Sequence, residues 1–403
     1  MHFSDTINIL EHDTFVSSHP LCNLLQSSRW ATIKKQWEHK FIGVKEGDVL
    51  LASSLVLIKH LPLGFTMFYI PRGPILDYQN QELVTFYFQH LQKYAKKFHC
   101  LFVKFDPQIH IRDFTLNEKN IPYNEETIII LYHLKQAGAL HKGFTTYIKD
   151  TIQPRFCMGV GKQEDMNIHV PRATLRSKNV ALRKHVQVER VGIEGLDDFC
   201  KVMHMTEERK HVQLRNKAYF QKLMETYGDS AYLFLATVDP HVRYEELKHI
   251  SQVAKTTLQA ESIGKKQRKK LEDERQQAEQ ELASMKEIVA KYKGKEVIAG
   301  GLMIGYGDDV EMLYAGMNED FRSFRPQYLT YMEQFTYAFA HGYSYVSMGG
   351  IEGTLEDGLA KYKANFNPCV TEFIGEFDLP VNRFLYHLSE VFYELRKKRK
   401  KKA

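Results

Sequence analysis

Hydrophobic and polar positions follow two different spacings along the chain, and these spacings predict strands and helices in turn. Short apolar runs favour strands, whereas apolar residues that recur every three or four positions favour one buried face of a helix. The expected strands cover residues 50–60, 66–76, 100–107, 230–239, 296–307, 309–317, 343–350 and 370–380. The expected helices cover residues 82–98, 197–212, 217–228 and 327–343. This layout predicts an α/β fold.

The length of 403 residues favours more than one hydrophobic core. Strands and helices recur in both halves of the chain, so we expect two similar α/β units in tandem. Between the strands at 230–239 and 296–307 lies an insertion, residues 243–295, that is rich in charge and glutamine and contains no proline.

The insertion has the apolar spacing of a coiled coil. Leu271, Ala278, Met285 and Tyr292 are seven residues apart, as in a heptad seam. Because the chain must return to the sheet that it left, we predict an antiparallel helical hairpin whose tip carries the basic run 264–270. Such an arm could contact nucleic acid, hold two copies together or be inert, and the pattern does not choose among these.

Composition and cysteine usage restrict the class of protein. Hydrophobic residues make up 43% of the chain and aromatic residues 12%, which is enough for packed cores. No apolar run approaches the roughly 18 residues of a membrane span, and the N-terminus lacks a signal pattern, so we expect a cytoplasmic protein. The five cysteines are scattered without a CxxC pair, which suits a reducing compartment and argues against a zinc site.

The net charge of +6 is concentrated in two runs, residues 264–270 and 396–402. Such clusters attract nucleic acid backbones or anionic lipid headgroups. A solvated surface or a frayed terminus explains them equally well at this stage.

Several residues could carry chemistry. A helix that begins near Ser27 or Ser28 would place Trp37 seven positions after Trp30 and beside Lys34, where an anionic, partly apolar ligand could bind. Arg215 precedes Tyr219 by four residues, a spacing that brings a phosphate-binding fork and a hydroxyl donor to one helix face. Core packing and chance spacing are the alternatives.

Two further positions stand at the ends of expected elements. Asp106 ends a predicted strand, where carboxylates of α/β folds often face a cleft, although Asp-Pro also opens ordinary turns. Lys363 lies at a predicted helix end before Asn365 and Pro368, where basic residues are common.

No Walker loop, dinucleotide fingerprint, HExxH or GxSxG motif occurs. The segment 155–161 has the wrong spacing for a coenzyme A pyrophosphate loop.

The order of several blocks resembles the FemABX-type aminoacyltransferases, and the resemblance extends over essentially the whole chain. The blocks are LQSSRWATIKKQWEH, LPLGFTMFYIPRGPILDY, FVKFDP, DTIQPR, LRNKAYF, LYAGM and KYKANFNPCVTEFIGEF. The chain is most similar to the streptococcal MurM/MurN branch, which adds serine or alanine. The resemblance implies two acetyltransferase-like domains, residues 1–152 with the segment 375–403 returning to them, and residues 153–374. The coiled-coil arm at 243–295 would be inserted in the second domain.

The resemblance also implies an activity. The enzyme would move an amino acid from aminoacyl-tRNA to the stem-peptide lysine of lipid II, with Lys363 stabilising the oxyanion and Asp106 as a candidate base. The residues implied to bind the acceptor are Lys34, Trp37, Phe102, Arg215, Tyr219 and Tyr314. The residues expected to contact tRNA are Tyr362, Lys363, Lys265, Lys266, Arg268, Lys269 and Lys270.

The expected partners are tRNA charged with serine or alanine, lipid II, and an anionic inner-membrane surface contacted by the basic C-terminus. No cofactor or metal is expected, and we expect a monomer at the inner face of the plasma membrane. Two rival hypotheses stay open: a tRNA-dependent transferase that acts on a lipid headgroup or a protein, and a non-catalytic coiled-coil RNA-binding protein.

Overall fold

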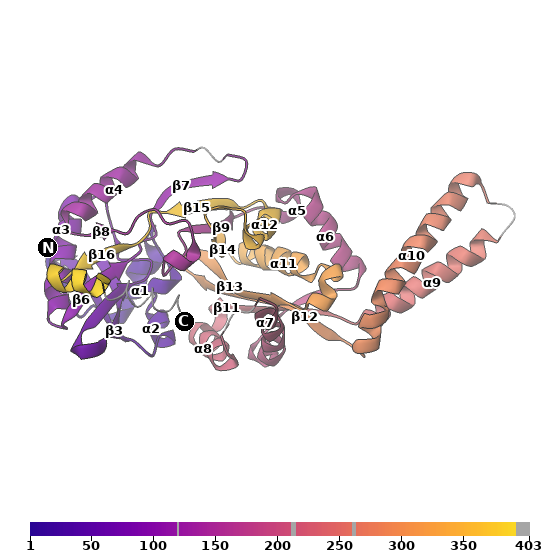
Figure 1. Ribbon diagram of the computed structural model, residues 1–403, viewed down its shortest axis with the longest axis horizontal. Helices are drawn as coiled ribbons and strands as arrows, with labels where there is room; N and C mark the ends of the chain where they lie inside the picture. The colour runs from indigo at the N-terminus through magenta and orange to yellow at the C-terminus, as the bar shows by residue number, and fades with distance from the viewer. Residues whose placement is uncertain (119–120, 211–214, 260–262, 392–403) are drawn as a thin grey trace.

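Two mixed β-sheets lie side by side in the computed structural model, and a pair of long helices projects from the second sheet (Figure 1). The structure describes residues 1–118, 121–210, 215–259 and 263–391. The predicted α/β class, the tandem arrangement and the projecting helical arm are confirmed.

The first sheet is antiparallel except for one parallel pair, β4 and β6, which the helix α3 connects. Its strands, in spatial order, are β1 (His2–Ser4), β2 (Glu38–Glu46), β3 (Val49–His60), β4 (Thr66–Ile70), β6 (Cys100–Phe105), β16 (Phe377–Pro380) and β8 (Leu140–His141), and β5 (Ile75–Leu76) pairs with β3. Its helices are α1 (Ile9–Ser18), α2 (Ser28–Ile33), α3 (Gln81–Lys96) and α4 (Glu125–Gln136). The apolar face of α3 covers this sheet and closes the first core.

The second sheet repeats this plan, with β13 and β14 as the parallel pair and α11 as the connecting helix. Its strands, in spatial order, are β10 (Gln187–Val191), β11 (Ala231–Val238), β12 (Glu296–Tyr306), β13 (Asp309–Met317), β14 (Tyr345–Ile351), β9 (Phe156–Gly161), β15 (Cys369–Phe373) and β7 (His110–Thr115). Its helices are α5 (Met166–His169), α6 (Arg172–Arg183), α7 (Leu196–Lys210), α8 (Lys217–Tyr227), α11 (Pro326–Ala340) and α12 (Gly358–Lys363). Figure 1 shows α5, α6, α11 and α12 on one face and α7 and α8 on the other.

Strands cross between the two halves of the chain. β7 belongs to a stretch expected in the first domain, yet it pairs with β15 in the second sheet. The single strand predicted over residues 370–380 is wrong, because β15 lies in the second sheet and β16 lies in the first. Residues 374–376 make the step between them, and Gly375 adopts a φ of +98° that only glycine takes easily.

The two domains share an apolar core. Side chains of α2, β3 and β4 pack against those of α7, α8 and β12. Ser27 caps α2, as predicted, and its hydroxyl also lies 2.8 Å from the Tyr227 hydroxyl of α8. The helix ends at Ile33, so the expectation that Trp37 continues its face is wrong; Trp37 lies in the turn before β2.

The arm consists of α9 (Pro240–Leu258) and α10 (Lys265–Lys291), which pack antiparallel (Figure 1). Leu247 and Ala254 of α9 are buried with Ala278 and Met285 of α10, so the predicted heptad seam is the one that the two helices use. Among the described residues, no helix has both the length and the apolar content that a membrane span requires.

Candidate active site

The carboxyl group of Asp106 lies at the end of β6 and is almost fully buried. Its Oδ2 accepts a hydrogen bond from the Tyr69 hydroxyl at 2.8 Å, and its Oδ1 accepts one from the Arg72 backbone N–H at 2.6 Å. Burial raises the pKa of Asp106 to about 7, although the Arg72 charge and both hydrogen bonds oppose this rise. A carboxyl group with this pKa can accept a proton near neutral pH.

Arg72 connects this carboxyl group to the second sheet. Its backbone has a φ of +51°, a conformation that is unusual outside glycine, and this turn aims its N–H at Asp106. Its guanidinium group donates to the Pro154 carbonyl at 2.7 Å and lies 4.2 Å from the ring centre of Phe373 in β15. One residue therefore joins the end of β6 to β15, through its backbone N–H on one side and its side chain on the other.

Lys363, the last residue of α12, is 3% exposed. Its Nζ donates to the carbonyl oxygens of Gly349 and Gly350 in β14, at 3.0 and 2.9 Å. These contacts hold a positive charge at a fixed place inside the protein. A preorganised cation of this kind is the group that stabilises a developing oxyanion.

The carboxyl group of Glu311, in β13, lies near two positive charges, those of Arg72 and Lys363. Burial raises the pKa of Glu311, and the Ser347 hydrogen bond and the charges of Arg72 and Lys363 oppose this rise. Arg72 therefore lies near both Asp106 and Glu311, and Lys363 lies near Glu311.

The described residues contain no group of three or more His, Cys, Asp or Glu side chains placed to hold a metal ion.

A second group, on the other face of the second sheet, brings together four of the residues expected to bind the acceptor. The Arg215 guanidinium lies 5.1 Å from the Tyr219 ring, and the Tyr219 and Tyr314 rings are 6.0 Å apart. Burial lowers the pKa of Lys34, and the nearby Arg215 charge lowers it further. Arg215 precedes α8 instead of lying within it, because Asn216 caps the helix, but the expected meeting with Tyr219 occurs.

Trp37 lies between this group and the Asp106 carboxyl. Its ring is 6.4 Å from the ring of Tyr69, the residue that donates to Asp106, and the Lys59 ammonium lies 5.6 Å from the centre of the Trp37 ring.

Phe102 is placed differently from the other expected acceptor residues. Its ring packs 5.5 Å from Tyr386, in the helical segment 383–391 that covers the same end of the first sheet.

A pocket of about 460 Å³ opens beside Tyr362, the residue that precedes Lys363. Its lining includes the aromatic and basic residues Tyr328, Tyr331, Tyr362, Arg209, Arg322 and Arg325. It also includes Glu319, which forms ion pairs with Arg209 and Arg322. The Tyr362 hydroxyl and the Gln327 Oε1 atom are buried there without a hydrogen-bond partner in the part of the chain that the structure describes. The pocket also receives the N-terminus of α11, which no side chain caps. These features suit a ring with polar edges attached to an anion.

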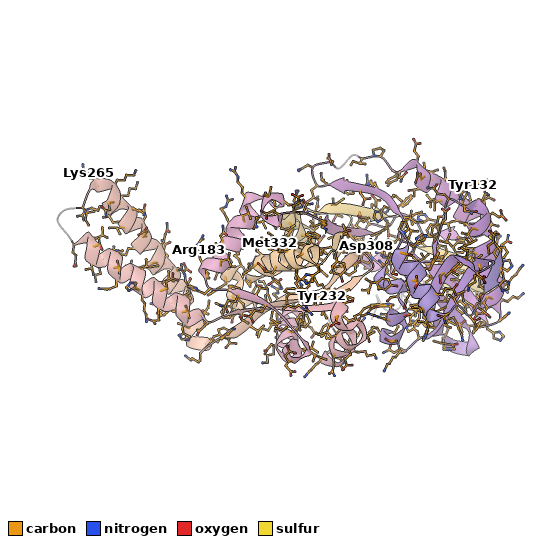
Figure 2. All side chains as sticks on the ribbon, turned by 180° about the vertical axis from the view of Figure 1, so that it is seen from behind. Tyr132, Arg183, Tyr232, Lys265, Asp308 and Met332 are labelled. Carbon is orange, nitrogen blue, oxygen red and sulfur yellow. The ribbon has the colours of Figure 1, made fainter. Side chains whose placement is uncertain are left out.

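The basic residues at the arm tip lie far from these groups. Lys265, Lys266, Arg268, Lys269 and Lys270 begin α10 and are all exposed. Figure 2 shows Lys265 at the outer end of the arm. The second basic run, residues 396–402, lies outside the described residues.

Arg72, Glu311 and the arginines of the pocket were not anticipated from the sequence. A backbone turn with positive φ at an arginine leaves no periodic signal, and Glu311 sits in a strand whose other residues are mostly apolar. The run RSFRPQ, residues 322–327, did contain a signal, because two arginines directly before a helix start favour an anion site.

Comparison with known proteins gives a consistent set of relatives. The FemAB family model matches residues 7–394. A lipid II:glycine glycyltransferase of Staphylococcus epidermidis is 30% identical over 400 residues, which cover 94% of this chain and 93% of that protein. A lipid II:glycine glycyltransferase of Staphylococcus aureus is 30% identical over 406 residues, with the same coverage of 94% and 93%.

Among solved structures, the crystal structure of FemX is similar over nearly the full length. The TM-score is 0.74 at 27% sequence identity, with 96% of this chain and 99% of that chain covered. The similarity therefore includes both sheets and the arm that projects from the second sheet.

Proposed function

This chain belongs to the FemAB family, and from that premise we propose that it transfers serine or alanine from aminoacyl-tRNA to the stem-peptide lysine of lipid II. It is an aminoacyltransferase with two tandem acetyltransferase-like domains. The relatives named above act on lipid II. The product would be a branched peptide cross-bridge of peptidoglycan.

The observation that carries the proposal is the adjacency of Tyr362 and Lys363. These consecutive residues of α12 place an aromatic wall of the pocket next to a buried, fixed ammonium group. The pocket accommodates the terminal adenosine of a tRNA, whose base would stack on tyrosine and whose phosphate would meet the arginines and the start of α11. The ester of the bound aminoacyl group would then lie toward Lys363.

The acceptor would occupy the group around Arg215. Burial lowers the pKa of Lys34, and the positive charge of Arg215 lies close enough to lower it further. A diphosphate bound between these two cations would relieve their repulsion. Tyr219 and Tyr314 would cover the adjoining sugar, and Trp37 would guide the stem peptide toward Asp106.

The reaction is aminolysis of an ester. The side-chain amine of the stem-peptide lysine attacks the ester carbonyl, and a tetrahedral oxyanion forms near Lys363. The carbon–oxygen bond to the ribose then breaks, so that an amide forms and the ribose hydroxyl is released. Asp106, with its pKa of about 7, can take the proton that the attacking amine loses, and the departing ribose oxygen takes up one proton, so that Asp106 is ionised again once it releases its own. Holding both substrates in place supplies much of the remaining rate.

Two basic segments would assist outside the reaction centre. The exposed arm tip, with five basic residues between 265 and 270, would contact the tRNA body. The C-terminal run 396–402 would dock the monomeric enzyme on the anionic inner face of the plasma membrane, where lipid II is embedded.

Transfer of radiolabelled amino acid to purified lipid II tests the proposal. Separate reactions would contain Ser-tRNA, Ala-tRNA or Gly-tRNA, without ATP, coenzyme A or added metal. We expect label in lipid II from serine or alanine. Label from glycine alone would correct the amino acid, and label in lipids or proteins of membranes that lack lipid II would replace the acceptor. No transfer from any tRNA, with tRNA binding intact, would favour a non-catalytic RNA-binding protein.

A further inference from the structure

The solvent-facing side of α6 is a stripe of arginine side chains. Arg172, Arg176 and Arg183 are exposed and recur at spacings of four and seven, so that they share one face of the helix. Thr174 and Ala181, on the opposite face, are fully buried. The packing of α6 thus fixes which way the arginines point.

The charge on this stripe is not neutralised locally. Residues 166–188 contain five lysines and arginines and no aspartate or glutamate. Within the described parts of the chain, no ion pair joins Arg172, Arg176 or Arg183 to an acidic side chain. Three guanidinium groups are therefore free to bind an anion.

The two ends of α6 connect the active site to the arm. At its start, the Thr174 hydroxyl donates to the Asn365 carbonyl, two residues after Lys363. At its end, the Lys184 ammonium lies 3.2 Å from Glu281 of α10. Figure 2 shows Arg183 at the end of α6 nearest the arm and Lys265 at the arm tip.

We infer that the arginine face of α6 binds the sugar-phosphate backbone of RNA, and specifically the acceptor stem of the tRNA donor. This inference rests on the proposed function for its partner. A helix of 12 residues is about 16–18 Å long, so it can follow several consecutive phosphates of a stem that leaves the pocket beside Tyr362. Arginine forks grip phosphates without reading bases, which suits a surface that meets every tRNA sequence alike.

The shape of this region favours RNA over a membrane. The arm rises on the same side of the second sheet as α5 and α6, and α6 slopes from α5 toward the base of the arm (Figure 1). Figure 2 shows that Arg183, at the end of α6 nearest the arm, lies lower than Lys265 at the arm tip. A nucleic acid can follow this slope, whereas a flat bilayer that rests on the arm tip and on α5 is held away from Arg183.

Binding of an uncharged tRNA transcript to the full chain, measured by fluorescence anisotropy over a range of salt concentrations, tests the inference. In the triple variant Arg172→Gln/Arg176→Gln/Arg183→Gln we expect about tenfold or weaker binding, and a slope of log affinity against log salt that is smaller by about 2–3. A minihelix of the acceptor stem alone should show the same loss. Wild-type affinity and slope in the triple variant would overturn the inference.

Two control variants separate local contact from net charge and from misfolding. Lys93→Gln/Lys96→Gln/Lys97→Gln removes the same charge from an exposed part of α3 and its C-terminus, and should change the affinity less than twofold. Arg172→Lys/Arg176→Lys/Arg183→Lys keeps the charge and should retain most of the binding. An equal loss in the α3 variant would show that only bulk charge matters and would overturn the inference.

The same variants distinguish this inference from the proposed function. If lipid II transfer occurs and the α6 glutamine variant binds tRNA normally, the surface is wrong and the function stands. If the α6 glutamine variant loses tRNA binding but no charged tRNA donates its amino acid to lipid II, the assignment of the α6 surface is confirmed and the proposed function is wrong. Loss of binding to anionic vesicles, with tRNA binding intact, would assign α6 to a membrane and overturn the inference.

Discussion

At the scale of single residues, the proposed mechanism depends most on Lys363. We expect Lys363→Ala to lower kcat by about 100-fold or more, because an oxyanion would lose its fixed counter-charge, while KM for lipid II changes little. Steady-state kinetics with both substrates measure this split. Lys361→Ala is the matched control, because Lys361 lies on the same helix but is exposed. Similar rates in wild type and Lys363→Ala would remove Lys363 from the mechanism.

Asp106 predicts a pH dependence of activity. A base with a pKa of about 7 gains activity as it ionises, so kcat/KM should rise with pH through about 7 and level off above it. Asp106→Asn should be slower and should lack this rise. A rise with the same midpoint in Asp106→Asn would assign it to another group.

The same carboxyl group predicts a pH dependence of stability. The native pKa of about 7 exceeds the ordinary value of 3.8, so between these values native Asp106 keeps a proton that the unfolded chain has released. The free energy of unfolding should therefore fall as pH rises across this window. Urea unfolding at pH 5 and pH 8 should show a smaller difference in Asp106→Asn than in wild type.

Some of these residues could be predicted from the sequence because their signals are local. The spacing of Arg215 and Tyr219 predicted their contact, even though the helix starts only after Arg215. The buried position of Lys363 could not be predicted, because Gly349 and Gly350, whose carbonyls hold it, belong to another strand. Nothing in the pattern around Arg72 indicates that it would join two sheets.

At the scale of elements, α12 and the start of α11 line the pocket beside Tyr362, where we propose that the tRNA end binds. We expect Tyr362→Ala to raise KM for aminoacyl-tRNA by about tenfold, the effect of losing one stacked base, and to leave KM for lipid II nearly unchanged. Tyr362→Phe keeps the ring against Tyr328 and Tyr331 and should change KM much less. Equal effects of Tyr362→Ala on both substrates would place the ring elsewhere in the reaction.

The arm predicts a local effect on stability. Met285 is fully buried in the seam between α9 and α10, so Met285→Ala should destabilise the arm by about 2–4 kcal/mol. Hydrogen exchange should then quicken in α9 and α10 but not in the first sheet. Val253→Ala, at an exposed position of α9, is the control. Faster exchange throughout the protein would mean that the arm does not open as a separate unit.

Elements were more predictable than their pairing. Apolar spacing predicted α3, α8, α11 and the hairpin of β12 and β13, because each depends on neighbouring residues. The pairing of β7 with the second sheet was missed, because strand pairing over hundreds of residues depends on contacts that no local pattern contains. The return of β16 to the first sheet agrees with the segment 375–403 assigned to the first domain, but the family resemblance implied that assignment and the local pattern did not.

At the scale of the whole molecule, the two domains share one core and form a single frame, on which we propose that two substrates meet. This core positions Arg215 and Tyr219, the proposed acceptor residues, and Arg72 joins the end of β6 to β15. The expected donor pocket is lined by α7, the end of β13, the start of α11 and α12, whereas the expected acceptor group lies around α2, α8 and β13. Two substrates bound in these two places would not occupy the same surface.

The most direct test is a single-turnover, rapid-quench measurement with aminoacyl-tRNA labelled in the amino acid, lipid II and excess enzyme. Loss of the ester and gain of label in lipid II would be followed in the same samples, for wild type and Lys363→Ala. We expect ester loss and amide formation to match one to one, without ATP, coenzyme A or metal, and both to slow about 100-fold or more in Lys363→Ala. Amide formation at the wild-type rate in Lys363→Ala, or ester loss without amide, would contradict the proposed mechanism.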